Sequence, residues 1–294
     1  MQPRQYLLIA NRAYAWERMV RLGLNVAGIA AVAGSYLERR LVAEGVPHFS
    51  FDRKRQLLDW LKLQSADVVV SNGCPFILPI SALTEPLPGV RFVNLHPSCL
   101  PDLKGPHPIN GALLHGRDAG ASCHLMDDGI DTGSIISRVR IPFSPDLDAG
   151  LLYQLCFQAE ADAFELALTR DFAPLPASET LPGPRELPLL YYRAGEEDLR
   201  IDFGESAQQI CRRIRAFATR GRGAFAIIAG ERFVIRDVET IENPYVLEQL
   251  PKHADRSILF VYEGRVVVRL GSECLKLKAI EGPVEKLSPA QRLV

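Results

Sequence analysis

Short apolar runs alternate with amphipathic stretches over the first part of the chain. The apolar runs predict buried strands, at residues 6–10, 26–32, 67–71 and 90–96. The stretches between them place apolar residues at helical spacing and predict helices, at residues 14–22, 36–44 and 56–64. Strands that alternate with helices are joined by right-handed crossovers. This part is therefore predicted to be α/β, with a doubly wound, mostly parallel sheet.

The next part of the chain has a regular pattern of apolar and polar positions, which ends at a proline-rich segment. Residues 121–126 and 134–141 alternate apolar and polar positions, which predicts an edge hairpin, and residues 149–168 predict a long helix. Residues 173–188 contain five prolines, and proline breaks helices and cannot donate to a strand ladder. This segment predicts a linker.

A smaller, mainly β domain is predicted after the linker. Residues 206–217 have the periodicity of a helix. Short strands are predicted at 225–228, 232–238, 258–262, 265–270 and 274–279. The predicted organisation is an α/β domain at 1–172, a proline-rich linker at 173–198 and a β-rich domain at 199–294.

Composition narrows the class of protein. The chain has 294 residues, 47% hydrophobic and 23% charged, and a net charge of −1, which argues against a strongly basic nucleic-acid binder. The apolar run at residues 7–10 is too short for a signal peptide, and no later run is long enough to span a membrane. We therefore expect a cytoplasmic protein, whose six scattered cysteines are reduced.

The loops at the carboxyl ends of the predicted strands are where ligands bind in an open parallel sheet. The loop after the first strand lacks G-x-G-x-x-G, and the chain contains no phosphate-binding P-loop motif. These absences disfavour a Rossmann-type dehydrogenase and a P-loop enzyme.

Asn94 and His96 stand two residues apart at the end of a predicted strand, so their side chains share one face. An amide donor beside an imidazole suits acyl chemistry, because the amide can hold a developing oxyanion and the imidazole can donate to it or manage a proton. The alternative is a polar strand end with a hydrogen-bonded histidine.

A loop rich in aspartate and glycine runs from Met126 to Gly133. Within it, Asp131 could orient His96 or relay a proton through water. A solvated turn is the alternative, and the spacing of a calcium loop is absent. Several histidines and cysteines could suggest zinc, but their spacing matches no zinc template: His96, Cys99, His107, Cys123 and His124.

An arginine-rich segment lies in and after the helix predicted at 206–217. It contains Arg212, Arg213, Arg215, Arg220 and Arg222. Such a run could bind phosphate or RNA, but the near-neutral chain favours a solvated helix face.

Taken together, these motifs resemble the folate-dependent formyltransferases, which include methionyl-tRNA formyltransferase, glycinamide ribonucleotide transformylase and the sugar N-formyltransferases. The resemblance rests on Asn94-x-His96-Pro97-Ser98-x-Leu100-Pro101, on Lys104-Gly105, and on Gly129-Ile130-Asp131-Thr132-Gly133. Residues 67–79 look like the family's pterin loop, and residues 191–193, 201–203 and 223–225 like the start of its auxiliary domain. It implies a Rossmann-like catalytic domain and a small OB-like C-terminal domain.

The resemblance also implies the chemistry and its residues. The formyl donor would be 10-formyltetrahydrofolate, and no metal would be needed. Asn94 and His96 would stabilise the oxyanion, while His96 and Asp131, with water, would accept the amine proton. The donor would be held around two loops, by Phe76, Ile77, Leu78, Pro79, Met126, Asp127, Gly129 and Ile130.

The acceptor is suggested by departures from the tRNA enzyme. Its Phe-x-Gly-Thr-Pro loop is replaced here by residues 9–13, and its Arg-Trp-Arg-Gly-type loop by residues 102–108. These changes favour a small-molecule amine, a nucleotide-linked amino sugar first and a hydroxyornithine-type amine second. Methionyl-tRNA formyltransferase and 10-formyltetrahydrofolate hydrolase remain alternatives, and a homodimer stays open. The expected substrate-binding residues are Asn11, Arg12, Ser98 and Lys104.

Overall fold

The computed structural model describes residues 4–180, 189–219 and 221–293. Contacts divide the chain into two compact units. Unit 1 comprises Met1–Pro108, Asp118–Pro142 and Gln154–Tyr192. Unit 2 comprises Ile109–Arg117, Phe143–Tyr153 and Arg193–Val294. Residues 181–188 of the predicted linker lie outside the described residues.

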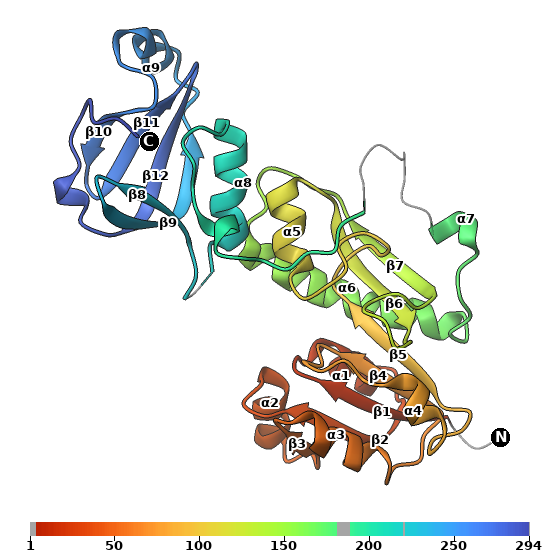
Figure 1. Cartoon of the computed structure of the whole chain (residues 1–294). Coiled ribbons are helices and arrows are strands. Elements are labelled where there is room, and N and C mark those ends of the chain that lie inside the picture. The colour runs from red at the N-terminus through yellow and green to blue at the C-terminus, as the bar shows by residue number, and fades with distance from the viewer. Residues whose placement is uncertain (1–3, 181–188, 220, 294) are drawn as a thin grey trace. The chain divides into compact units, whose positions relative to one another are not determined.

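Unit 1 is built on a seven-stranded sheet with the order β3-β2-β1-β4-β5-β6-β7 (Figure 1). Strands β1 to β5 run parallel, and β6 and β7 complete the sheet as antiparallel strands. The strands are β1 Gln5–Ala10, β2 Asn25–Val32, β3 Phe49–Phe51, β4 Val68–Asn72, β5 Arg91–His96, β6 Ala119–Leu125 and β7 Ile135–Ile141. The predicted mostly parallel sheet and its edge hairpin are both confirmed.

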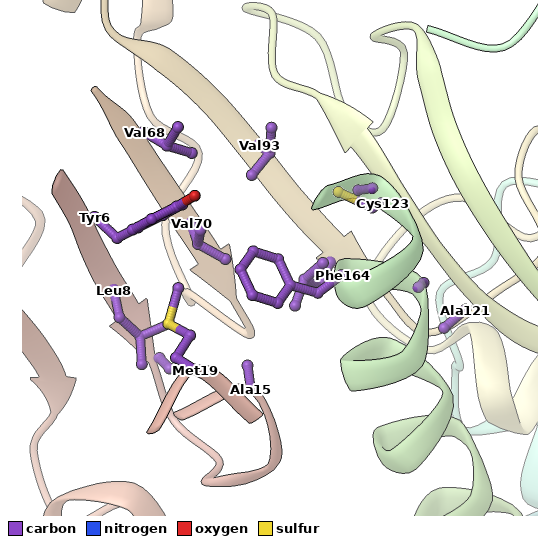
Figure 2. Close-up of a cluster of buried hydrophobic side chains, with 14 of the residues drawn as sticks. Tyr6, Leu8, Ala15, Met19, Val68, Val70, Val93, Ala121, Cys123 and Phe164 are labelled. Carbon is purple, nitrogen blue, oxygen red and sulfur yellow. The ribbon is translucent and has the colours of Figure 1, made fainter. Parts of the chain in front are cut away.

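The residues of β1 alternate between two hydrophobic clusters, one on each face of the sheet. Tyr6 and Leu8 join one cluster, whereas Leu7 and Ile9 join the other. Figure 2 shows the first cluster, where Phe164 and Met19 pack beside the strands. This alternation follows from the two-residue period of a strand, and helices on both faces supply the apolar partners.

The helices that cover the sheet agree with the apolar periodicity of the sequence. Met19 of α1 and Leu41 of α2 lie in the first cluster, and Leu57 of α3 in the second. The helices of this half of the chain are α1 Tyr14–Arg21, α2 Tyr36–Glu44, α3 Lys54–Leu61, α4 Ile80–Thr84, α5 Pro108–His115, α6 Ala149–Thr169 and α7 Ala177–Thr180. The sequence analysis did not predict β3, α4, α5 or α7. Three of these have only three to five residues, and α5 is buried on nearly all sides, so it lacks the alternation of apolar and polar positions that marks a helix.

Unit 2 contains a separate antiparallel sheet with the order β10-β11-β12-β9-β8. Helix α8, Ala207–Phe217, packs Ile210 and Ile214 into the same hydrophobic cluster as the sheet. Ser206 caps this helix by accepting a hydrogen bond from the Gln209 N–H. The remaining elements are β8 Ala224–Ile228, β9 Glu231–Thr240, α9 Pro244–Gln249, β10 Ser257–Tyr262, β11 Arg265–Leu270 and β12 Glu273–Glu281. The predicted β-rich C-terminal part is confirmed.

Across the described part of the chain, no helix combines the length and the apolar character that crossing a membrane requires.

Strand β1 lies between β2 and β4, so the crossover direction reverses at this point of the sheet. A crevice opens at the carboxyl ends of parallel strands where the order reverses, and ligands bind there in folds of this kind. The loops after β1, β4 and β5 begin at Asn11, Gly73 and Pro97. Polar residues on these loops are therefore the first candidates for a site.

Candidate active site

Asn94 and His96 occupy the carboxyl end of β5, and the neighbouring strand places a second histidine beside them. His124 of β6 is the direct cross-strand partner of Asn94. Residues paired across two strands project from the same face of a sheet. The Asn94 Nδ2 atom lies 3.1 Å from His124 Nε2, within hydrogen-bond distance.

The loop between β6 and β7 brings Asp131 to these side chains. A Cβ at Gly133 would collide with the Leu125 carbonyl oxygen, so the loop can fold back this tightly only with glycine there. Asp131 has a φ of +52°, a left-handed conformation that aspartate tolerates better than most residues. Its Oδ1 atom lies 3.5 Å from His96 Nδ1 and 3.7 Å from His124 Nε2.

Backbone contacts fix the protonated nitrogen of each ring. His96 Nε2 lies 3.0 Å from the Leu103 carbonyl oxygen, which can only accept, so we assign the proton to Nε2. His124 Nδ1 lies 2.7 Å from the Leu125 carbonyl oxygen, which likewise assigns the proton to Nδ1. His124 Nε2 is then an acceptor, and Asn94 must turn its amide nitrogen toward it.

Burial and charge act in opposite directions on the two ionisable groups of the site. Burial lowers the pKa of His96, although the Asp131 charge opposes that change. Burial alone would raise the pKa of Asp131, but the interactions with His124, His96 and the Gly105 N–H outweigh it and lower the pKa to about 2. At neutral pH, this favours a neutral imidazole beside a carboxylate.

This arrangement can accept a proton and donate a hydrogen bond. The unprotonated Nδ1 of His96 faces the Asp131 carboxylate at 3.5 Å, so two acceptors confront each other. A proton placed between them turns this contact into an attraction. Asn94 uses one amide N–H on His124 and has a second N–H for a developing oxyanion.

The structure brings together the two loops predicted to hold the donor. Asp128 Oδ1 accepts a hydrogen bond from the Ser81 N–H, 3.1 Å away, at the start of α4. Phe76 and Met126 pack against the same hydrophobic cluster. Ile77 and Ile130 are 54% and 40% exposed, so each loop presents an apolar side chain to solvent. Asp127 is used inside its loop, where it accepts from the Gly129 N–H and the Thr132 hydroxyl.

The expected substrate-binding residues differ in how far their polar groups are already engaged. Arg12 forms a bidentate ion pair with buried Glu160, and its guanidinium lies 4.2 Å from the centre of the Phe157 ring. Ser98 is buried and donates its hydroxyl to the Asp102 carbonyl. Asn11 and Lys104 are half-buried. A substrate role for these four residues stays a prediction.

Two polar residues of this region were missed or set aside by the sequence analysis. His124 was considered only as a zinc ligand, although aligning β5 with an antiparallel β6 would have placed it opposite Asn94. Glu160 lies within the apolar pattern of α6, and a carboxylate among buried positions is a signal for a charged partner. Within the described ranges, no group of three His, Cys, Asp or Glu side chains could hold a metal ion.

The arginine-rich segment does not form the solvated face that was expected. Arg212 lies over the ring of Phe143, Arg213 pairs with Glu205 at 2.5 Å, and Arg215 donates to the Pro145 carbonyl. All three side chains are partly buried. That expectation is wrong for the helical arginines, while Arg220 lies outside the described residues.

Family models match most of the chain. Residues 42–168 match the formyl transferase model, and residues 194–294 match the model of the formyl transferase C-terminal domain. The chain belongs to the formyl transferase family, which confirms the resemblance inferred from its motifs.

Curated relatives and a solved structure extend this result. The chain is 36% identical to methionyl-tRNA formyltransferase from Thermus thermophilus over 63% of this chain and 59% of that protein. It is 30% identical to methionyl-tRNA formyltransferase from Synechococcus sp. (strain JA-3-3Ab) over 86% of this chain and 78% of that protein. The match therefore spans about three fifths of the length of the Thermus relative.

The fold is similar to that of an N-formyltransferase from Helicobacter canadensis, crystallised with folinic acid and dTDP-3-aminofucose. The TM-score is 0.67 at 14% identity, over 94% of this chain and 99% of that one. At this identity the likeness concerns the fold, and it agrees with the predicted fold class.

Proposed function

We propose that this protein transfers a formyl group from 10-formyltetrahydrofolate to the primary amine of a small molecule. The observation that carries the proposal is the cluster of Asn94, His96, His124 and Asp131 at the carboxyl edge of the sheet. It combines an oriented amide donor with a proton-accepting pair, the two functions that acyl transfer to an amine needs.

The loops beside this cluster fit a flat, partly apolar donor. Ile77 and Ile130 expose apolar side chains on loops that are tied together by Asp128 and the Ser81 N–H. The donor supplies the formyl group when bound. Asn94 donates its second amide N–H to the formyl oxygen as negative charge develops there. As the amine nitrogen bonds to the formyl carbon, the Nδ1 atom of His96 receives the amine proton, and the Asp131 carboxylate stabilises the resulting imidazolium. His96 then gives this proton to the departing nitrogen when the bond between that nitrogen and the formyl carbon breaks.

His124 acts on Asn94 rather than on the reacting atoms. Its Nε2 atom accepts one amide N–H of Asn94 and so fixes which end of the amide faces the site. We propose that it is a positioning residue.

For the acceptor, we propose a nucleotide-linked amino sugar. The Helicobacter canadensis enzyme, whose structure holds dTDP-3-aminofucose, matches this chain over nearly the full length of both. Arg12 is neutralised by Glu160, so Lys104 and Asn11 are the predicted residues best suited to meet phosphate or hydroxyl groups.

Methionyl-tRNA is the second candidate acceptor. The relatives at 36% and 30% identity are methionyl-tRNA formyltransferases, and this observation favours the tRNA.

An acceptor panel separates these proposals. The purified chain is incubated with 10-formyltetrahydrofolate and, in parallel, with a set of nucleotide-linked amino sugars, with methionyl-tRNA, or without an amine. Mass spectrometry follows the gain of one formyl group, and formate is assayed in the reaction without an amine. A formylated sugar supports the first proposal, formylated methionyl-tRNA supports the second, and formate release alone identifies a hydrolase.

Variants then test the site with whichever acceptor reacts. We expect His96→Ala to reduce kcat about 10²–10⁴-fold because the proton acceptor is lost. We expect Asn94→Ala to reduce kcat about 10²–10³-fold because the oxyanion donor is lost. His48→Ala is the matched control, since His48 is half-buried in unit 1 away from the cluster and its ring bonds to the Val46 carbonyl. Full turnover by His96→Ala would contradict the proposed site.

A further inference from the structure

A cavity of about 410 Å³ lies within unit 2. Its wall comes from Leu113 of α5, from residues 143–147, from α8 together with Ser206 before it, and from the ends of β9 and β12. None of its lining residues belongs to unit 1, which contains Asn94, His96 and Asp131. The volume is in the range of small-molecule sites.

Arg212 of α8 lines this cavity and is held in place from two sides. Its guanidinium lies 5.5 Å from the centre of the Phe143 ring, which is a cation–π contact. On another side it lies against Gly116, where an added Cβ would come within 2.8 Å of the guanidinium carbon. Gly116 has a φ of +62°, a left-handed backbone conformation that favours glycine.

Arg212 has a buried hydrogen-bond donor that finds no acceptor among the described residues. Its Nε atom is buried and has no hydrogen-bond partner among the residues that the structure describes. Across the same residues, no carboxylate lies within ion-pair distance of Arg212, whereas Arg213 beside it pairs with Glu205. Buried donors are nearly always paired in proteins, so this orphaned group points to a missing acceptor.

The other residues that line the cavity include both polar and apolar side chains. Arg215 follows one turn after Arg212 and donates one N–H to the Pro145 carbonyl, which leaves further N–H groups. Glu273 is the only carboxylate among the lining residues, against two guanidinium groups. Hydroxyl and amide side chains and apolar side chains complete the lining: Ser144, Thr240, Ser206, Gln208, Phe143, Leu113 and Leu147.

We propose that this cavity binds a small molecule that carries an oxyanion, either a phosphate or a carboxylate, on Arg212 and Arg215. The planar guanidinium forms two parallel hydrogen bonds with such groups, and its contact with the Phe143 ring fixes the orientation of the guanidinium before the ligand binds. The apolar remainder of the ligand lies against Leu113, Phe143 and Leu147. A small ligand fits the limited volume better than an RNA backbone does. This site does not depend on the proposed formyl transfer.

Calorimetric titration of the full chain in phosphate-free buffer tests the proposal. The probes are inorganic phosphate, AMP and benzoate, with adenosine as the matched ligand without an anion. We expect AMP or benzoate to bind and adenosine not to bind. Binding must persist in Asn94→Ala, because the cavity shares no residue with the formyl-transfer cluster.

Three variants have different expected effects on the affinity of the cavity for the anion. Arg212→Gln should weaken anion binding about tenfold or more, since a charge-assisted contact is lost. Glu273→Gln should strengthen anion binding, because the negative charge that repels the anion is removed. This variant still tests the proposal if Arg212→Gln folds poorly. Arg213→Gln is the matched control and should leave affinity unchanged, because Glu205 already occupies its guanidinium.

Equal affinities of the wild type, Arg212→Gln and Glu273→Gln for AMP and benzoate would overturn the proposal. So would the absence of binding by all three anionic probes, or Arg212-dependent binding of a short single-stranded RNA without binding of the small anions.

Discussion

Arg12 in unit 1 and Arg212 in unit 2 both lie over phenylalanine rings, but among the described residues only Arg12 has a carboxylate partner. Arg12 lies 4.2 Å from the centre of the Phe157 ring and binds Glu160 through two nitrogens. Arg212 lies 5.5 Å from the centre of the Phe143 ring and, among the described residues, faces no acid. Both arginines thus make a contact of the same kind with an aromatic ring, but only the charge of Arg12 is balanced by a carboxylate among the described residues.

This difference suggests that a partly buried charge can serve either the stability of the fold or the binding of a ligand. A charge that is matched inside the fold fixes the backbone around it, and here it holds the loop after β1 against α6. Burial raises the pKa of Glu160, and the Arg12 charge opposes that change. A charge without an internal partner is available to a ligand. The contrast predicts that changes at the first arginine affect stability and changes at the second affect binding.

The largest expected effect comes from breaking the matched pair. Glu160→Gln leaves the Arg12 charge uncompensated inside the protein, and we expect the free energy of unfolding to fall by about 3–5 kcal/mol. Urea denaturation measures the loss. The matched control is Glu165→Gln on the same helix, whose carboxylate is 41% exposed and whose partner Arg18 keeps Asp162 as a second acid, so the loss should be less than about 1 kcal/mol. A loss at Glu160 no larger than that at Glu165 would contradict this account.

Asp131 lies between these two cases, because its carboxylate accepts a hydrogen bond from the Gly105 N–H and is compensated by His96 and His124 only when these histidines are protonated. Its pKa is lowered to about 2 in the folded protein, so its contribution to stability is present above the pKa of the unfolded chain and is lost as pH falls toward 2. The expected contribution is about 2 kcal/mol.

Urea denaturation of the wild type and Asp131→Asn at pH 6 and pH 3 measures this contribution. We expect the difference in unfolding free energy between them to shrink by about 1 kcal/mol at the lower pH. The exposed carboxyl of Asp52 supplies the control variant, Asp52→Asn. A difference for Asp131→Asn that does not change with pH would show that the carboxylate is not stabilised by its neighbours.

The smallest expected effect on stability is at the unmatched arginine. Arg212→Gln removes a cation–π contact and leaves no unpaired carboxylate behind, so we expect the free energy of unfolding to fall by less than about 1 kcal/mol. The measurement is again urea denaturation. A loss as large as that of Glu160→Gln would mean that Arg212 is a structural group, and the comparison of the two arginines would fail.

Much of the fold followed from the sequence because its elements are long and periodic. The apolar runs identified β1, β2, β4 and β5, and period two placed Asn94 and His96 on one face. The pairing of Asn94 with His124 depends on strand register, which a single sequence does not state. The closeness of Asp131 depends on a left-handed backbone conformation, and the partner of Arg12 lies on a distant helix. Contacts of this kind are set by tertiary packing.

The ion pair between Arg12 and Glu160 joins residues 148 positions apart, which has a consequence for the order of folding. During synthesis the chain grows from its N-terminus, so the loop after β1 leaves the ribosome long before α6 does. Until α6 docks, the Arg12 guanidinium stays hydrated, because the carboxylate that binds it has not yet arrived. The Arg12 side chain can therefore reach its folded position only late, after α6 has been translated.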